Sequence, residues 1–145
     1  KICTSLAEKI KSAFTEFNLI LSPAMGGIVI GYEIGRILNI ETIFVERVNN
    51  NFQIRRGFEI NRNHKILVVE DVITTGKSSL ECSSLAEKCG AEVVGYASLI
   101  DRTGGKSEIK KIVSQVKLDI STFTADNIPE NLKKLKAVKP GSRNL

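Results

Sequence analysis

The chain has 145 residues and a formal net charge of +5 at pH 7, and its length suits one domain rather than two. Its hydrophobic share of 42% is ordinary for a globular domain, and no apolar run approaches the ~20 residues of a membrane-spanning helix. Three cysteines without a CxxC pair exclude a disulfide framework and a zinc site, and one histidine excludes a mechanism that needs two within the chain. We therefore expect a cytoplasmic protein, away from any membrane, whose positive charge suits a nucleic acid or a phosphorylated small molecule.

Helices and strands are predicted to alternate along the chain. In chain order the pattern predicts a helix over 4–17 capped by Thr4, a strand over 19–21, a helix over 28–38, strands over 42–45 and 65–69, a helix over 78–89, strands over 93–100 and 112–120, and a short basic helix from Pro129 capped by Asp126 or Asn127. This alternation predicts an α/β fold with a mostly parallel sheet flanked by helices on both faces. Ligands of such folds bind at the carboxyl ends of the strands, where residues 22–27 and 70–78 lie.

Residues 46–60 follow a different pattern. Apolar residues alternate with polar ones on both sides of Arg55-Arg56-Gly57. The alternation predicts a β-hairpin or a long mobile loop. Polar Asn49-Asn50-Asn51 and the two arginines give this segment little to bury, so we expect it to open and close over a bound ligand.

The run from Val68 to Ser78 carries the strongest chemical pattern, VVEDVITTGKS. A buried strand is expected to end in two carboxylates, Glu70 and Asp71, and a short loop of hydroxyls and glycine then enters a helix. Free N–H groups and the positive end of the helix dipole hold a phosphate at such a helix start. The carboxylates repel a phosphate, so they are expected to bind a ribose diol or a magnesium ion beside it.

Two other interpretations of this run are weaker. Gly76-Lys77-Ser78 resembles the end of a nucleotide-triphosphate P-loop, but that motif needs a glycine where Asp71 stands. The acid pair could instead merely cap the following helix. Two adjacent acids that close a buried strand are a poor choice for capping alone, so we favour a substrate role for them.

Residues 68–78 resemble the signature with which type I phosphoribosyltransferases bind phosphoribosyl pyrophosphate (PRPP). Further segments resemble the orotate branch of that family. They are Ser22-Pro23-Ala24-Met25-Gly26-Gly27, similar to its pyrophosphate loop; Phe44-Val45-Glu46-Arg47 with Arg55-Arg56-Gly57-Phe58, similar to its mobile catalytic loop; Ser98-Leu99-Ile100-Asp101-Arg102, similar to its base-binding strand end; and residues 139–143, similar to the tail of one bacterial branch.

The resemblance implies transfer of ribose 5-phosphate from PRPP to N1 of orotate in de novo pyrimidine biosynthesis, with orotidine 5′-monophosphate and pyrophosphate as products. It also implies a homodimer whose active sites are completed across the interface, and magnesium as cofactor, held mainly by PRPP. The implied PRPP-binding residues are Glu70, Asp71, Val72, Ile73, Thr74, Thr75, Gly76, Lys77 and Ser78, with Ala24, Met25, Gly26 and Gly27 for the pyrophosphate. The implied catalytic residues are Asp71, Arg47, Arg55 and Arg56, the arginines acting on the leaving pyrophosphate.

Orotate is a carboxylate, and a planar guanidinium binds a carboxylate through two parallel hydrogen bonds. Arg102, just past a strand, fits that role, and the resemblance adds Thr74 as a second contact to orotate. The alternative for Arg102 is a surface arginine paired with Asp101. Two other functions stay open: transfer to a purine or uracil, which Arg102 disfavours, and a PRPP-sensing regulator that binds nucleic acid. A regulator of that kind needs an added DNA-binding helix pair, and the sequence shows none. We therefore expect no nucleic-acid partner.

Two departures from the family pattern matter. Many members carry Lys and His in the mobile loop, whereas Val48-Asn49-Asn50-Asn51 has neither, so the chemical role passes to Arg55 or Arg56. Members also usually have an N-terminal hood with a Thr-Ser-Gly motif and a lysine. The sequence starts at Lys1 without it. We expect residues 1–145 to form one core domain, and either the hood precedes Lys1 in the whole protein or the chain is impaired.

Overall fold

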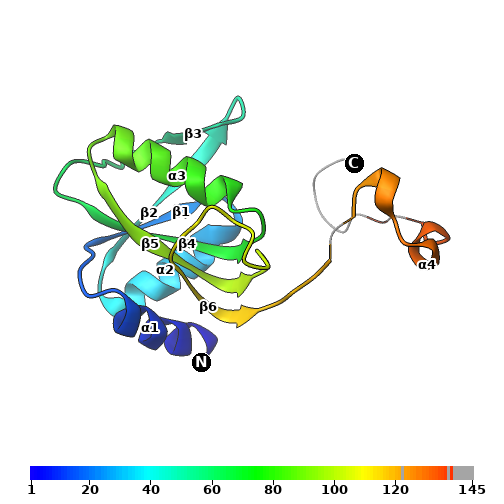
Figure 1. The fold of residues 1–145 in the computed structure, drawn as a ribbon. Coiled ribbons are helices and arrows are strands. Elements are labelled where there is room, and N and C mark those ends of the chain that lie inside the picture. The colour runs from blue at the N-terminus through cyan, green and yellow to red at the C-terminus, as the bar shows by residue number, and fades with distance from the viewer. Residues whose placement is uncertain (122, 137, 139–145) are drawn as a thin grey trace.

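The computed structural model describes residues 1–121, 123–136 and 138 (Figure 1). Its elements, in chain order, are α1 Ile2–Ala13, β1 Leu19–Pro23, α2 Gly26–Leu38, β2 Glu41–Val48, β3 Asn51–Ile54, β4 Lys65–Ile73, α3 Lys77–Lys88, β5 Glu92–Asp101, β6 Ile112–Lys117, the 3₁₀ turn η1 Ala125–Asn127 and α4 Glu130–Lys133. None of the described helices is long and apolar enough to cross a membrane. The resemblance at 139–143 falls outside the described residues.

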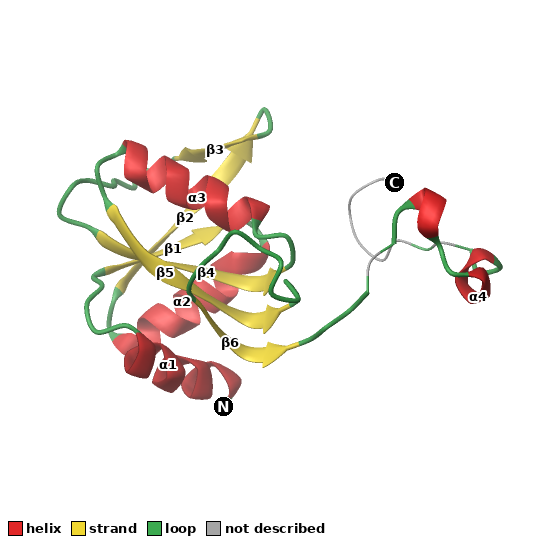
Figure 2. Ribbon diagram, viewed as in Figure 1, coloured by secondary structure: helices red, strands yellow, loops and turns green. Residues whose placement is uncertain are grey.

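A six-stranded sheet in the order β3-β2-β1-β4-β5-β6 forms the middle layer of the molecule. Strand β3 runs antiparallel to β2, and every other neighbouring pair is parallel. Helices α1 and α2 lie on one face of the sheet and α3 on the other, as Figure 2 shows. The predicted α/β fold is confirmed. A hairpin also forms, but it turns at Asn49-Asn50 between β2 and β3, and Arg55-Arg56-Gly57, where the turn was expected, follow β3. Because the parallel strands point the same way, the loops after β1, β4 and β5 meet at one edge of the sheet.

Side-chain alternation along the central strands builds two hydrophobic layers. On β4, Leu67 and Val69 pack with α1 and α2, whereas Ile66 and Val68 pack with α3. This is the period of two that a strand imposes on its side chains. All four residues are fully buried. The same alternation, continued two residues further, decides where the acid pair points.

Helix α1 is displaced from its predicted position. It begins at Ile2 and ends at Ala13, and its first hydrogen bond runs from Ser5 N–H to the Lys1 carbonyl at 3.1 Å, so Thr4 lies inside the helix and does not cap it. Phe14 was expected to be helical but is extended and 4% exposed. Its ring fills the space beside Gly95, where an added Cβ would lie 2.6 Å from the ring's Cζ and closer still to its Cε1. Tertiary packing at Gly95 therefore overrides the helical periodicity of 4–17.

Strand boundaries also differ from the prediction. Strand β4 continues to Ile73, so Glu70 and Asp71 lie within the strand instead of ending it. The extension is held by β5, because Val72 and Ile73 still pair with its last residues. Strand β6 stops at Lys117, not at 120, since β5 offers no further residues. The predicted caps of α4 are wrong: Pro129 occupies the N-cap position, and Asp126 and Asn127 belong to η1.

Three glycines let α2 approach the sheet closely. Gly27, Gly31 and Gly35 recur every four residues on the buried side of the helix. A Cβ at Gly27 would lie 3.0 Å from the Val69 carbonyl, and one at Gly35 would lie 2.8 Å from the Ile40 carbonyl. Backbone atoms cannot move aside as a flexible side chain can. The helix start, and the pyrophosphate loop before it, are therefore fixed against β4.

We expect Gly35→Ala to destabilise the protein by about 1–3 kcal/mol, the usual cost of overpacking a tight core. Alanine favours a helix over glycine by about 1 kcal/mol in an exposed position, so a loss of stability would report packing and not propensity. The measurement is urea denaturation followed by circular dichroism. Lys11→Ala, on the exposed side of α1, is the control and should change stability by less than about 0.5 kcal/mol. A stabilised Gly35→Ala protein would contradict the close contact.

Candidate active site

The acid pair of β4 is divided between the two faces of the sheet. Glu70 follows Ile66 and Val68 toward α3, where its Oε1 accepts a hydrogen bond from the buried Ser79 hydroxyl. Asp71 follows the other face toward α2, and an added Cβ at Gly26 would lie 2.8 Å from the Asp71 carboxyl carbon. Its Oδ1 also accepts a hydrogen bond from the Val72 N–H at 2.8 Å. The two adjacent carboxylates thus lie against two different helices.

Glu70 is the more deeply buried acid. It is 8% exposed, and this burial raises the pKa of its carboxyl group. The Ser79 hydroxyl and the positive charge of Arg47 act in the opposite direction, and Asp71 raises the pKa further. A buried carboxylate with one protein hydrogen bond still has acceptor capacity, which a ribose hydroxyl can satisfy.

The loop after β4 encloses a cavity of about 90 Å³ lined by Glu70 and residues 72–79. Gly76, with φ of 82°, turns the chain into α3, whose first helical hydrogen bond runs from Leu80 N–H to the Gly76 carbonyl at 2.9 Å. The N–H groups before Leu80 lie at the positive end of the helix dipole. The cavity therefore has the size and polarity for one small anion. Every residue predicted to bind the 5-phosphate, from Thr74 to Ser78, lines it.

A second loop closes over the phosphate loop from the β5–β6 connection. The Ser107 hydroxyl donates to the Thr75 carbonyl at 3.1 Å. A Cβ at Gly76 would lie 2.7 Å from the side chain of Ile109, which is itself 8% exposed. Glycine is thus required at Gly76 both by its positive φ and by this contact.

Arg102 lies at the end of the neighbouring strand, beside the phosphate loop. Its N–H donates to the Ile73 carbonyl at 2.8 Å, which places it next to Thr74 at the carboxyl edge. Asp101 is not its partner, because Oδ1 of Asp101 accepts from the Thr103 N–H at 2.9 Å. The Nε of Arg102 is buried and has no hydrogen-bond partner among the described residues. A buried donor without a partner is costly unless a ligand satisfies it.

The pyrophosphate-loop segment 24–27 joins β1 to α2. The Ala24 N–H donates to the Val45 carbonyl at 2.8 Å, and the peptide bond between Ala24 and Met25 is cis. Met25 is 79% exposed, whereas Gly26 lies against Asp71. The structure thus brings this loop next to the acid pair, as the sequence predicts.

The three arginines of the hairpin do not form one cluster. Arg47 turns toward α3, where it pairs with Glu81 and approaches Ser78. Arg56 pairs with Glu46 through two hydrogen bonds of 2.8 Å, and Arg55 lies 4.0 Å from the same carboxylate. Glu46 and Arg47 are successive strand residues, so their side chains point to opposite faces. Within one chain, Arg47 and the pair Arg55 and Arg56 therefore lie on different faces, and their expected action on the leaving pyrophosphate stays a prediction.

Several partners of the site residues were not identified from the sequence. Ser79 holds Glu70, Ser107 holds the phosphate loop, Glu46 holds Arg56, and Glu81 holds Arg47. Only Ser79 had a usable signal, since it directly follows the predicted phosphate-binding run. Within residues 1–121, 123–136 and 138, no group of three or more His, Cys, Asp or Glu side chains could hold a metal ion.

Comparison with known proteins gives the class of the protein. The family described as "Phosphoribosyl transferase domain" matches residues 1–133, and the chain belongs to this family. A relative from Methylorubrum populi named orotate phosphoribosyltransferase is 47% identical over 148 residues, which cover 100% of this chain and 75% of that protein. Within the family, the chain belongs with the orotate phosphoribosyltransferases.

Solved structures of the family share the fold. The orotate phosphoribosyltransferase of Aeropyrum pernix matches with a TM-score of 0.67 and 20% identity, over 81% of this chain and 70% of that one. The adenine phosphoribosyltransferase of Thermoanaerobacter pseudethanolicus matches with a TM-score of 0.67 and 18% identity, over 81% of this chain and 78% of that one. Because the two scores are equal, the fold does not decide which base is used, and the decision must come from site residues.

Glu70→Gln should separate substrate binding from stability. Because burial raises the folded-state pKa of Glu70, its contribution to stability is fully present below the unfolded pKa, near 4.5, and is lost as pH rises through the folded value. Glutamine carries no charge, so the variant should gain stability relative to the wild type between pH 4.5 and pH 7 while its use of PRPP falls about tenfold or more. Thermal unfolding at both pH values and steady-state kinetics measure the two effects.

Glu16→Gln is the matched control for that pH effect. The hydrogen bond and charge of Lys65 lower the pKa of Glu16, so its stabilising contribution is present above the unfolded pKa and lost as pH falls. The sign is opposite: this variant should lose stability relative to the wild type as pH rises. A Glu70→Gln protein that becomes less stable at pH 7 would mean that the carboxylate serves the fold.

Proposed function

We propose that the protein transfers ribose 5-phosphate from PRPP to N1 of orotate, giving orotidine 5′-monophosphate and pyrophosphate in the synthesis of UMP. The observation that carries this proposal is the position of Arg102. Its backbone N–H donates to the Ile73 carbonyl, which places the residue next to Thr74, at the carboxyl edge that also holds the acid pair and the phosphate cavity. The names of the sequence relatives support the same base. We place the reaction in the cytoplasm, a reducing compartment that suits three free thiols.

The chain positions PRPP by its charge pattern. The 5-phosphate binds in the cavity of residues 72–79, and the ribose hydroxyls donate to Glu70 and Asp71. Departure of pyrophosphate leaves positive charge on the ribose ring, which the two carboxylates stabilise, and negative charge on the leaving group, which the N–H groups of 24–27 stabilise. The chain thus acts by positioning and electrostatics, without a covalent intermediate.

Magnesium fits this site as a cofactor carried in with the substrate. Mg²⁺ commonly binds through one or two carboxylates together with substrate phosphates. Asp71 is the carboxylate that would hold it, because it is partly exposed and lies against the pyrophosphate loop at Gly26. When bound, the ion supplies positive charge to the pyrophosphate.

Orotate selection is assigned to Arg102. A guanidinium matches the planar orotate carboxylate, and its buried Nε would gain the partner that it lacks among the described residues. A purine or uracil has no carboxylate and would leave this donor unpaired. The fold alone would admit either base, since adenine phosphoribosyltransferases share it.

Arg102→Ala should raise the orotate concentration needed for half-maximal rate by about tenfold or more and leave the KM for PRPP nearly unchanged. Orotate-dependent release of pyrophosphate measures both values. Arg62→Ala, an exposed arginine elsewhere on the surface, should change neither. If calorimetry finds the same orotate affinity in Arg102→Ala and wild type, the assignment of orotate to this residue should be dropped.

A homodimer would explain the exposed face of α2. Met25, Val29 and Tyr32 are 79%, 71% and 63% exposed and follow one another at helical spacing. Such a stripe of large apolar residues marks a contact surface. It begins in the pyrophosphate loop, so a second copy bound there would stand at the edge of the active site. Within the described part of the chain, Arg55 and Arg56 pair with Glu46 at the hairpin surface and Arg56 also lies over the Phe44 ring, so they would then be placed to reach the neighbouring site.

A mixing experiment tests whether these arginines act on the neighbouring subunit. One subunit carries Asp71→Asn, and the other carries Arg55→Ala with Arg56→Ala. In a mixed dimer one site inherits both defects and the other neither. An equal mixture holds about half heterodimers, so about a quarter of wild-type activity should return. Pyrophosphate release before and after mixing measures it.

The control mixes Asp71→Asn with Glu70→Gln. Both residues lie on β4 of the same chain, so every site in a mixed dimer keeps one defect and no activity should return. Mixing that forms heterodimers of the arginine variant, as seen by native mass spectrometry, yet restores nothing would mean that the hairpin arginines act on their own subunit or are not catalytic.

A further inference from the structure

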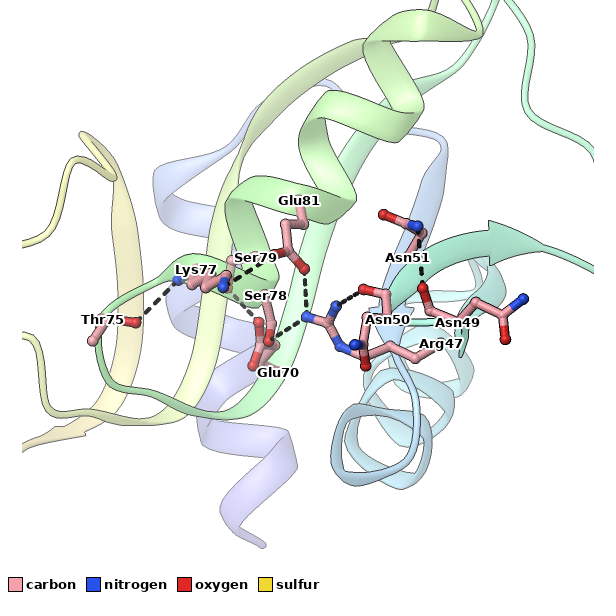
Figure 3. Close-up of polar contacts among 10 residues, drawn as sticks. All are labelled: Arg47, Asn49, Asn50, Asn51, Glu70, Thr75, Lys77, Ser78, Ser79 and Glu81. Carbon is pink, nitrogen blue, oxygen red and sulfur yellow. Dashed lines mark hydrogen bonds and ion pairs between the residues drawn. The ribbon is translucent and has the colours of Figure 1, made fainter. Parts of the chain in front are cut away.

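Arg47 is fixed by three contacts of its own chain, of which Figure 3 shows those with Asn50 and Glu81. One guanidinium nitrogen, Nη1, donates to the Asn50 carbonyl at 2.8 Å, across the turn of the hairpin. The guanidinium carbon lies 4.0 Å from the centre of the Phe52 ring, which is within the range of a cation–π contact. The other nitrogen, Nη2, pairs with Glu81 on α3. The strand and the aromatic ring therefore orient this cation whether or not Glu81 is present.

The guanidinium lies next to the phosphate cavity, at Ser78. Its Nη2 lies 3.4 Å from the hydroxyl oxygen of Ser78, a residue that lines the cavity. Its positive charge also acts on Glu70, another residue that lines the cavity, where it opposes the larger effect of burial, which raises the pKa of that carboxyl group. The cavity lies against the first turn of α3, and the pyrophosphate loop lies on the α2 side of β4. By position, Arg47 belongs with the 5-phosphate and not with the pyrophosphate.

Glu81 occupies the face of Arg47 that an anion would use. Its carboxylate lies between Arg47 and Lys77, with Lys77 Nζ at 3.9 Å. A phosphate in the cavity would repel this carboxylate and attract both cations. The arrangement suits an exchange in which Arg47 turns its Nη2 from Glu81 to the phosphate by a small movement, while Asn50 and Phe52 keep the rest of the guanidinium in place.

We propose that Arg47 is a specificity residue for the 5-phosphate of its own chain and that Glu81 competes with the phosphate for it. The inference rests on the proposed function, because it takes the cavity of residues 72–79 as the 5-phosphate site. It differs from the sequence-based expectation, in which Arg47 acts with Arg55 and Arg56 on the leaving pyrophosphate. The hairpin is then divided: Arg47 serves its own chain, and Arg55 and Arg56 serve the leaving group.

Two small ligands separate the two possible roles of Arg47. Ribose 5-phosphate carries only the 5-phosphate, and inorganic pyrophosphate with magnesium carries only the leaving group. Calorimetry of Arg47→Gln should show ribose 5-phosphate bound about tenfold or more weakly and pyrophosphate bound as in the wild type. Arg47→Lys keeps the charge but not the fork of donors, so its ribose 5-phosphate affinity should lie between the two. Arg62→Gln is the matched control and should change neither affinity.

Glu81→Gln tests the competition. Removing the carboxylate should tighten ribose 5-phosphate binding about two- to fivefold, the range expected for a partly exposed charge pair, and leave pyrophosphate binding unchanged. Glu87→Gln, near the other end of α3, makes the same change of charge away from the cavity and should have no effect. Unfolding temperatures of all variants identify any loss of folding.

The outcomes distinguish the inference from the function on which it rests. If the wild type does not bind ribose 5-phosphate, both the phosphate site and the role of Arg47 are wrong. If the wild type binds it and Arg47→Gln weakens pyrophosphate alone, or neither ligand, only the role of Arg47 is overturned. If Glu81→Gln fails to tighten ribose 5-phosphate, the competition is overturned and Arg47 remains as a phosphate contact.

Discussion

The alternation of side chains along β4 is the constraint on which the site depends. Four buried residues, Ile66 to Val69, are clamped between helices on both faces, so the strand cannot shift its register by one residue. Glu70 and Asp71 inherit that register and point to opposite layers. One acid meets Ser79 of α3 and the other meets Gly26 of α2. The hydrophobic core thus decides the direction of two charged groups that contribute nothing to it.

Close contacts at three glycines also constrain the structure around the site. Gly26 gives Asp71 room, Gly35 sets α2 against the sheet, and Gly76 turns the chain beneath Ile109. The contacts at Gly26 and Gly76 fix loops at the carboxyl edge, and the contact at Gly35 fixes the far end of α2. A site that binds a charged substrate gains when its donors are already oriented, because no reorganisation is then needed as charge develops. The arrangement costs stability at Glu70, because burial disfavours its charged form and raises the pKa of its carboxyl group.

The sequence predicted the parts of the site that depend on one strand and the loop after it. The acid pair lies near the end of a hydrophobic strand, the phosphate loop and Arg102 each follow one, and parallel strands bring such ends together. It could not predict Glu81 or Glu46, because these contacts depend on the register of the β2–β3 hairpin and on which helix covers it. It also misplaced the end of β4, since pairing with β5 carries the strand through the polar residues. Local patterns do not contain that information.

The β2–β3 hairpin carries charged side chains on both of its faces. Glu46 and Arg47 are neighbours in β2, and the strand sends their side chains to opposite faces. On one face, Arg47 contacts Glu81 and Ser78 of α3. On the other face, Glu46 pairs with Arg55 and Arg56, which come after the turn. Carboxylates thus pair with the cations on both faces of the hairpin. Under the proposed roles, each carboxylate competes slightly with an anion and keeps the arginines oriented until an anion replaces it. A mobile loop with unpaired arginines would bind anions without this selection.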